Sequence, residues 1–129
     1  MKKVICFSLA VFLSNAFAEA EECSWENRNK HQVESCLVDL VKERKSELKV
    51  VLSNVSAVVV GQEEEKISPD LIKEFEKNLQ DFEEYKNSFC TLYLGAKGVN
   101  VGTGGYATSL ECEAEVLKQR IQLLRKIEN

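Results

Sequence analysis

The chain has 129 residues, of which 44% are hydrophobic and 29% charged, and its formal net charge is −4. This length suits one domain with a single core. An acidic chain without a basic stripe is poorly suited to bind nucleic acid or an anionic membrane, but it can attract a cationic protein.

The N-terminus has the pattern of a secretory signal peptide. Lys2 and Lys3 precede the apolar run 4–13, and Ala16-Phe17-Ala18 is a small-x-small cleavage site. The run is too short to span a bilayer, so no stable membrane insertion is expected after cleavage. Residues 1–18 are therefore predicted to be removed, although Ala20 offers a second cleavage position. The short leader is typical of bacteria and predicts that domain 19–129 lies in the periplasm or is secreted.

Four cysteines remain once the leader and its Cys6 are removed: Cys23, Cys36, Cys90 and Cys112. An even number in a short exported chain indicates two disulfides. A four-thiolate zinc site would use close Cys-x-x-Cys pairs, which this sequence lacks. We therefore expect two disulfides and no metal.

The first predicted helix runs from about Gln32 to Val58, and Gly61 is a plausible stop. Arg44 lies near its apolar stripe and is expected to snorkel at the edge. The stripe has helical spacing. Its members are Val33, Leu37, Leu40, Val41, Leu48, Val51, Leu52, Val55 and Val58.

A polar turn over residues 61–68 precedes the second predicted helix. Its glutamates 63–65 are expected to be solvated, with a docking patch for a basic partner as the alternative. Ser68 is a suitable N-cap and Pro69 suits the first helical position. The helix should end near Cys90 to Leu94. Its predicted buried face comprises Leu71, Ile72, Phe75, Leu79, Phe82 and Phe89.

The stretch 95–105 holds five of the six glycines. Because no strand precedes it and no Lys-Ser/Thr follows, phosphate binding is not expected. It is predicted to be a long exposed loop that needs positive φ or a close backbone approach. The third helix should open at Thr108–Glu111, a capping-box pattern, and run nearly to Asn129. Its apolar positions are Leu110, Ala114, Leu117, Ile121, Leu124 and Ile127.

These elements predict an all-α fold: a small three-helix bundle or hairpin with a Gly-rich loop, stapled by two disulfides. In such a hairpin all four cysteines can gather at one end. Sequential pairing, Cys23–Cys36 with Cys90–Cys112, gives the shortest loops and is slightly favoured. Nested pairing, Cys36–Cys90 with Cys23–Cys112, fits the hairpin equally well.

No group of residues in the sequence predicts catalysis. The single histidine, His31, lies in a polar segment and is expected to be exposed. Glu83 and Glu84 are adjacent on a helix, so their side chains point about 100° apart and do not form an acid/base pair. We therefore expect no enzyme activity and no cofactor.

The second half of the chain contains the run Phe82-Glu-Glu-Tyr85-Lys86-Asn87-Ser-Phe-Cys90, followed by Gly104-Gly105-Tyr106 and by Cys112 with Arg120 and Leu124. This pattern resembles the LprI-type lysozyme-inhibitor domain family. Cys23 and Cys36 match the opening cysteine pair of that family. The resemblance thus extends from Cys23 to Leu124 and implies a periplasmic lysozyme inhibitor.

Several polar positions of the family pattern differ here. Phe82 stands where the family has Trp, Lys86 where it has Arg, and Tyr106 where it has Ser. Asn87 replaces an Asp, Leu117 replaces a Thr, and Lys45 and Lys49 occupy the places of an Asp and an Asn in helix one. The cysteine frame and the helical spacing persist. A structural role also remains open, in which Tyr85 caps the core near a disulfide and Arg120 pairs with Glu83 or Glu84.

Two functional hypotheses follow from these patterns. The first is an inhibitor that binds a cationic lysozyme or related peptidoglycan hydrolase, or its variant, an immunity protein against a cell-wall toxin. Its candidate contact loop is Gly102, Thr103, Gly104, Gly105 and Tyr106, with Tyr106 as the aromatic anchor. The second is an envelope interaction module without inhibitory activity.

Overall fold

The computed structural model describes residues 22–99 and 104–128. It contains three helices, α1 (Lys30–Glu64), α2 (Leu71–Ala96) and α3 (Tyr106–Glu128). The described residues include no strand, so the predicted all-α, three-helix architecture is confirmed. The predicted signal peptide lies outside the described residues, as do Gly102 and Thr103 of the candidate loop.

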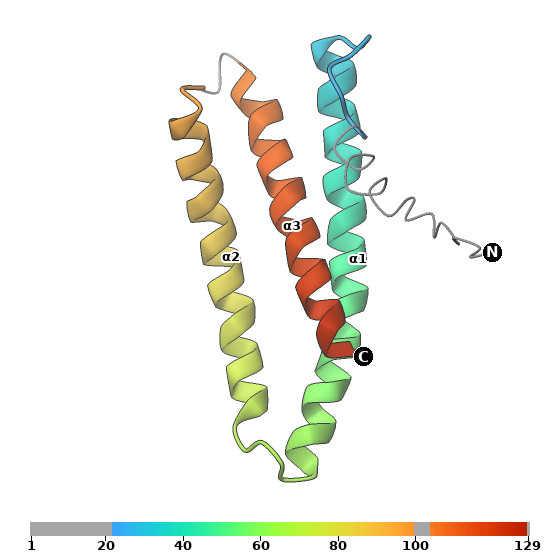
Figure 1. Cartoon of the computed structure of the whole chain (residues 1–129), viewed down its shortest axis with the longest axis vertical. Coiled ribbons are helices and arrows are strands. Elements are labelled where there is room, and N and C mark those ends of the chain that lie inside the picture. The colour runs from blue at the N-terminus through green and yellow to red at the C-terminus, as the bar shows by residue number, and fades with distance from the viewer. Residues whose placement is uncertain (1–21, 100–103, 129) are drawn as a thin grey trace, which may run out of the picture.

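The three helices run up and down, and α3 lies between α1 and α2 over most of its length (Figure 1). α1 and α2 approach each other at the turn that joins them. The shorter α3 stops before that turn, where Asn54 Nδ2 donates a hydrogen bond to Glu128 Oε1 at 3.1 Å. None of the described helices is long and apolar enough to span a membrane.

α1 is longer than predicted at both ends. Asn29 caps it, since its side chain accepts from the Gln32 backbone N–H at 3.0 Å and Gln32 Oε1 accepts from the Asn29 N–H at 2.9 Å. The helix passes through Gly61, so the predicted stop is wrong. Val59 is buried and Val58 is exposed, the reverse of the predicted stripe. Burial of Val55 and Val59 offsets the weak helix propensity of this segment.

The predicted start of α2 is also wrong. Ser68 does not cap the helix, which begins at Leu71 with Asp70 as N-cap residue in the left-handed region (φ 66°) and no side-chain capping bond. Backbone bonds complete the end of α1 instead, because the Ile67 N–H donates to the Gln62 carbonyl at 3.1 Å. Ser68 and Pro69 are therefore used in the turn, and α2 continues to Ala96.

α3 begins two residues before the predicted capping box. Thr108 lies inside the helix, and its hydroxyl donates to the Gly104 carbonyl at 3.2 Å instead of accepting from a backbone N–H. Gly104 has φ +87° and Gly98 has φ +66°, so the predicted need for positive φ is confirmed at both. Neither glycine has a neighbour near its Cβ direction, so no close approach explains it.

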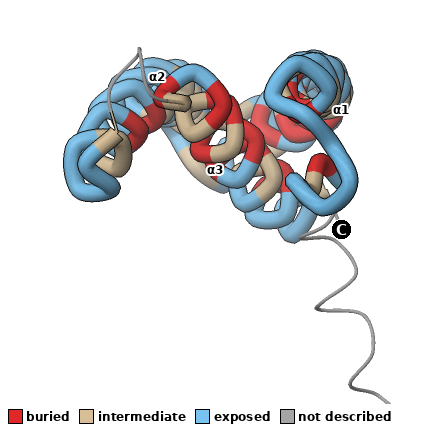
Figure 2. Tube along the Cα trace, turned by 90° about the horizontal axis from the view of Figure 1, so that it is seen from above, coloured by how far each residue is buried: buried red, intermediate tan, exposed pale blue. Residues whose placement is uncertain are grey.

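The core lies mainly between α1 and α3, where most of the buried positions in Figure 2 are found. Leu117 of α3 and Val33 and Val55 of α1 are the largest fully buried side chains. Ile127, predicted to be part of the buried stripe of α3, is exposed instead. The predicted apolar stripes therefore account for most of the interface between α1 and α3.

α2 buries far less of its surface than the other two helices. Of all its residues only Lys86 and Cys90 are buried. Ile72 and Phe89 were both predicted to be buried, and each is 37% exposed. Phe75 and Phe82 pack against the core but remain partly exposed. α2 is therefore attached to the α1–α3 pair along a narrow strip.

Candidate functional site

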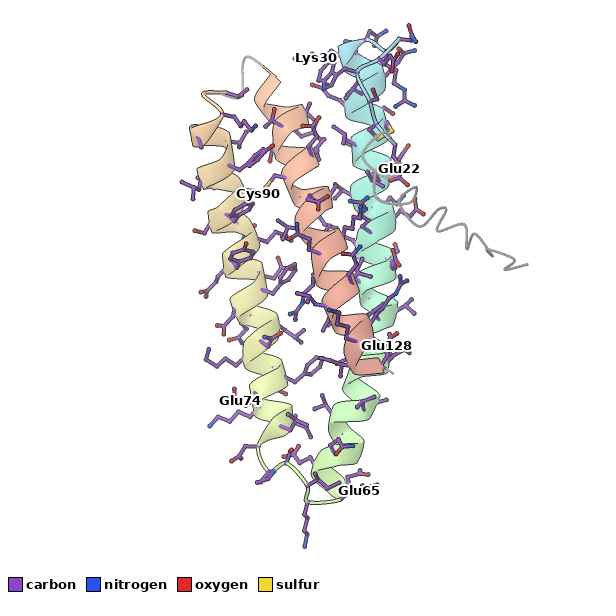
Figure 3. All side chains as sticks on the ribbon, in the orientation of Figure 1. Glu22, Lys30, Glu65, Glu74, Cys90 and Glu128 are labelled. Carbon is purple, nitrogen blue, oxygen red and sulfur yellow. A yellow bond between two sulfur atoms is a disulfide. The ribbon has the colours of Figure 1, made fainter. Side chains whose placement is uncertain are left out.

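Two disulfides form at one end of the bundle. Cys23 pairs with Cys36 and Cys90 with Cys112, with Cα–Cα distances of 5.6 and 5.7 Å, so the sequential pairing is correct and the nested pairing is wrong. Cys36, Cys90 and Cys112 each lie about one and a half turns inside their helix. Figure 3 labels Cys90 on α2 and Glu22, at the start of the described chain, in this half of the molecule.

Three of the residues that carry the family resemblance, Phe82, Lys86 and Arg120, meet between α2 and α3. The Arg120 guanidinium carbon lies 4.9 Å from the Phe82 ring centroid, and Lys86 Nζ lies 6.0 Å from the same centroid. Arg120 Nη2 also donates to Asn78 Oδ1 at 2.5 Å. The predicted pairing of Arg120 with Glu83 or Glu84 is therefore wrong, because Phe82 and Asn78 occupy the α2 surface that Arg120 reaches.

Arg120 binds α2 without a carboxylate partner among the described residues. Burial lowers the pKa of its guanidinium, because the charged form loses hydration, and its Nε has no hydrogen-bond partner within the described structure. The guanidinium nevertheless stays protonated at any physiological pH. The contact is thus a cation held against an aromatic ring, worth about 0.5–2 kcal/mol depending on its exposure.

Lys86 is the one buried charged residue within the described ranges and belongs to a chain of ion pairs across all three helices. Its Nζ lies 2.9 Å from Glu83 Oε2 and 3.8 Å from Glu113 Oε1. Glu113 Oε1 is in turn 2.6 Å from Lys45 Nζ of α1. Lys86 therefore lies between two carboxylates, those of Glu83 and Glu113. Their negative charges stabilise a cation that would be costly to bury alone.

Tyr85 does not cap the core as predicted, because it is 55% exposed. Its ring stacks on Phe89 with centroids 5.6 Å apart, and Phe89 lies 6.3 Å from Tyr93. Spaced four residues apart, the three rings form a continuous row along α2, hereafter the aromatic ladder. The ladder leaves two large aromatic side chains, Tyr85 and Phe89, open to solvent.

A groove of about 410 Å³ runs beside the aromatic ladder, hereafter the aromatic groove. Phe89 and Tyr93 form its α2 wall, and Cys112 and Val116 of α3 lie in its floor. The opposite wall includes the Cys23 segment, Leu40 and Arg44. The groove thus joins the two disulfides and all three helices at one surface.

Carboxylates line the rim of the aromatic groove. Glu111 and Glu115 come from α3, and Glu22 comes from the segment before α1. Glu22 lies 3.5 Å from Arg44 Nη2. Arg44 itself is held at the edge of the core, as predicted, where it also donates to the Ala114 carbonyl at 2.5 Å. The groove is apolar inside and negatively charged at its edge.

The described part of the candidate loop separates into buried and exposed positions. Gly105 is buried, Gly104 is half-buried, and Tyr106, at the start of α3, is 51% exposed. Tyr106 does not line the aromatic groove. It lies on another side of α3, beside Val38 and Leu110. The predicted anchor and the aromatic ladder therefore belong to different surfaces.

The remaining polar candidates are His31 and the glutamates at 63–65. His31 is exposed, as predicted, and lines an open hollow of about 690 Å³ with Asp39 and Glu43. No three His, Cys, Asp or Glu side chains within the described ranges lie where they could hold a metal ion. Glu64 and Glu65 are exposed, and Glu63 is half-buried.

The sequence interpretation missed the residues that form the aromatic groove. Phe89 was assigned to the core, and Tyr93 was treated as the end of a helix. The signal was present in the spacing of Tyr85, Phe89 and Tyr93, which places one ring per turn on the same side of α2.

No protein-family model matches this sequence, and comparison with curated proteins and with solved structures finds no match either.

Proposed function

We propose that this chain is a disulfide-stapled binding protein of the bacterial periplasm, or a secreted one, that inhibits a cationic lysozyme or related peptidoglycan hydrolase. The two disulfides support an oxidising, extracytoplasmic location. The proposed activity is binding and not catalysis, and it requires no cofactor. The family resemblance in the sequence points to the same role.

The observation that carries the proposal is the aromatic groove. Exposed aromatic side chains dominate the binding energy of protein interfaces when a partner covers them. Phe89 and Tyr85 are such side chains, and the apolar floor beside Phe89 gives a partner a place to insert. Together they provide the apolar centre with a polar rim that protein interfaces require.

The charge of the groove determines which partner fits. Glu111 and Glu115 contribute two carboxylates to the rim, and the whole chain carries a formal charge of −4. A cationic protein would therefore be steered to this surface, and its Lys or Arg side chains could pair with the rim. Tyr106 fits this partner less well, because three lysines of α1 lie beside it.

The test is a turbidity assay of cell-wall lysis by lysozymes of several types, in the presence of purified oxidised protein. We expect saturable inhibition that Tyr85→Ala with Phe89→Ala abolishes. Ile72→Ala is the matched control, because Ile72 lies on the same helix with the same 37% exposure as Phe89 but at the opposite end. Far-ultraviolet circular dichroism establishes that each variant folds. Equal inhibition by both variants would exclude the aromatic groove as the docking surface.

A second candidate function is an envelope interaction or immunity module without general lysozyme inhibition. One observation favours it: Phe82, Lys86 and Arg120 all act inside the fold, where they attach α2. The resemblance at these positions is therefore explained by structure and does not itself require inhibition. Lack of inhibition at large molar excess, with recovery of one envelope protein by the immobilised wild type and not by the Phe89→Ala variant, would support this function.

A further inference from the structure

A second groove lies across the α1–α3 pair from the aromatic groove, hereafter the lysine groove. The two grooves share no residue of α1 or α3. On α3 the aromatic groove uses Glu111 and Glu115, whereas the lysine groove uses Leu110 and Glu113, which face another direction on the helix. They are therefore independent surfaces.

The lysine groove is positively charged in an otherwise acidic protein. Lys42, Lys45 and Lys49 recur three and four residues apart on α1, so they lie along one side of that helix. Lys45 is neutralised by Glu113 at 2.6 Å. Lys42 and Lys49 therefore lie on either side of the Lys45–Glu113 ion pair, without a carboxylate partner of their own among the described residues.

The interior of this groove is apolar. Val41 and Leu110, both almost fully buried, form its floor. Val38 and Tyr106 form its walls and are about half exposed, at 40% and 51%. A hydrated polyanion such as an acidic glycan would use the lysines but gain nothing from the valine, leucine and tyrosine surface. A ligand that fits both must place apolar side chains between carboxylates.

An amphipathic helix with acidic flanks has this chemistry. Its apolar side chains repeat at three and four residues and can lie along a groove of this kind between two helices. Its flanking Glu or Asp side chains would reach Lys42 and Lys49 at the rim. We propose that the lysine groove is a second docking surface, which binds an acidic amphipathic helix of a protein partner, with Tyr106 covering its apolar ridge.

This proposal goes beyond inhibition of a hydrolase, because it concerns a partner of the opposite charge. With a cationic partner in the aromatic groove and an acidic helix in the lysine groove, one molecule would connect two proteins. Tyr106, the residue predicted as the anchor of the loop, would then serve the second partner and not the hydrolase.

The test uses a fluorescently labelled synthetic peptide in which leucines at helical three-and-four spacing are flanked by glutamates. Binding to the full chain is measured by fluorescence anisotropy at physiological salt. Lys42→Glu with Lys49→Glu should weaken it by about tenfold or more, because two attractive rim contacts become repulsive. Lys73→Glu with Lys77→Glu is the matched control, since both lysines are exposed on α2, and it should leave the affinity unchanged.

Two competitors and one hydrodynamic measurement separate the occupants. A scrambled peptide of the same composition and poly-glutamate should each bind at least about tenfold more weakly, because neither presents an apolar ridge. Equal binding of poly-glutamate, or no peptide binding, would overturn the proposal. Sedimentation showing a dimer that Lys42→Glu with Lys49→Glu dissociates would also overturn it, because a second copy of this chain would then occupy the groove.

Discussion

The interface between α1 and α3 and the attachment of α2 are held together by different forces. α1 and α3 share a core made largely of valine, leucine and isoleucine side chains, with Val33 and Leu117 among its most buried members. α2 buries only Lys86 and Cys90 and is attached by a disulfide, a ring between two cations, and a chain of ion pairs. The first interface is hydrophobic, whereas the second combines a covalent link and polar contacts with the partly exposed packing of Phe75 and Phe82 against the core.

This difference explains why the aromatic ladder is exposed. A helix that must bury its aromatic side chains to stay attached cannot also offer them to a partner. Because the Cys90–Cys112 bridge holds α2 without deep burial, Tyr85 and Phe89 can remain at the surface. We infer that the α1–α3 pair supplies the stable platform and that α2 presents the contact surface.

The largest expected effect is damage to the platform. Leu117→Ala should reduce the free energy of unfolding by about 2–5 kcal/mol, because Leu117 is fully buried and its removal leaves a cavity. Denaturant unfolding followed by circular dichroism measures this change. Leu123→Ala, on the exposed side of the same helix, is the control and should change little. A loss below about 1 kcal/mol for Leu117→Ala would show that the platform is not the stable part.

Removal of the covalent link should have the next largest effect. Cys90→Ser with Cys112→Ser should cost about 3 kcal/mol, the chain-entropy value for a bridge that spans 22 residues. Amide hydrogen exchange should then become faster throughout α2 while α1 and α3 keep their protection. Uniform loss of protection in all three helices would contradict the separation into platform and attached helix.

A smaller effect is expected from the cation that covers Phe82. Arg120→Ala removes both the contact with the Phe82 ring and the bond to Asn78, and should cost about 1–2 kcal/mol. Arg120→Lys should recover only part of this loss, because a lysine cannot stack a planar group on the ring. Thermal unfolding of the two variants measures the difference. Full recovery by lysine would show that charge alone matters at this position.

The smallest effect is expected at the buried lysine. Lys86→Met keeps the length of the side chain and should change stability by less than about 1.5 kcal/mol in either direction, because the lost ion pairs are offset by the removed desolvation cost. Glu113→Gln should be more destabilising, because it leaves Lys86 and Lys45 without the carboxylate that they share. Greater damage from Lys86→Met than from Glu113→Gln would reverse this interpretation.

The sequence predicted the architecture better than it predicted the surface. Valine and leucine at helical spacing placed the α1–α3 interface, and loop length favoured the observed disulfide pairing. The capping patterns at Ser68 and Thr108 predicted the wrong helix starts. Backbone hydrogen bonds of the turn precede the start of α2, and the positive φ of Gly104 precedes the start of α3. A local capping pattern cannot show how the neighbouring turn is closed.

The aromatic residues of α2 could not be assigned from their type alone. Phe82 and Phe89 share a helix and an apolar side chain, yet Phe82 packs against the core and Phe89 lines an open groove. The Phe82 ring lies beneath Arg120 and Lys86, whereas Phe89 lines the groove beside Cys112 and Val116. Periodicity indicates which residues share a face, but it does not indicate whether another helix covers that face.

The most direct test compares lysozyme inhibition by the oxidised wild type with inhibition by the Cys90→Ser, Cys112→Ser double variant, in the turbidity assay. If α2 presents the docking surface only while the bridge holds it, the wild type should inhibit and the double variant should lose at least about tenfold in potency. Equal inhibition by the two proteins would contradict this dependence. Absence of inhibition by the oxidised wild type against every lysozyme type would contradict the proposed function itself.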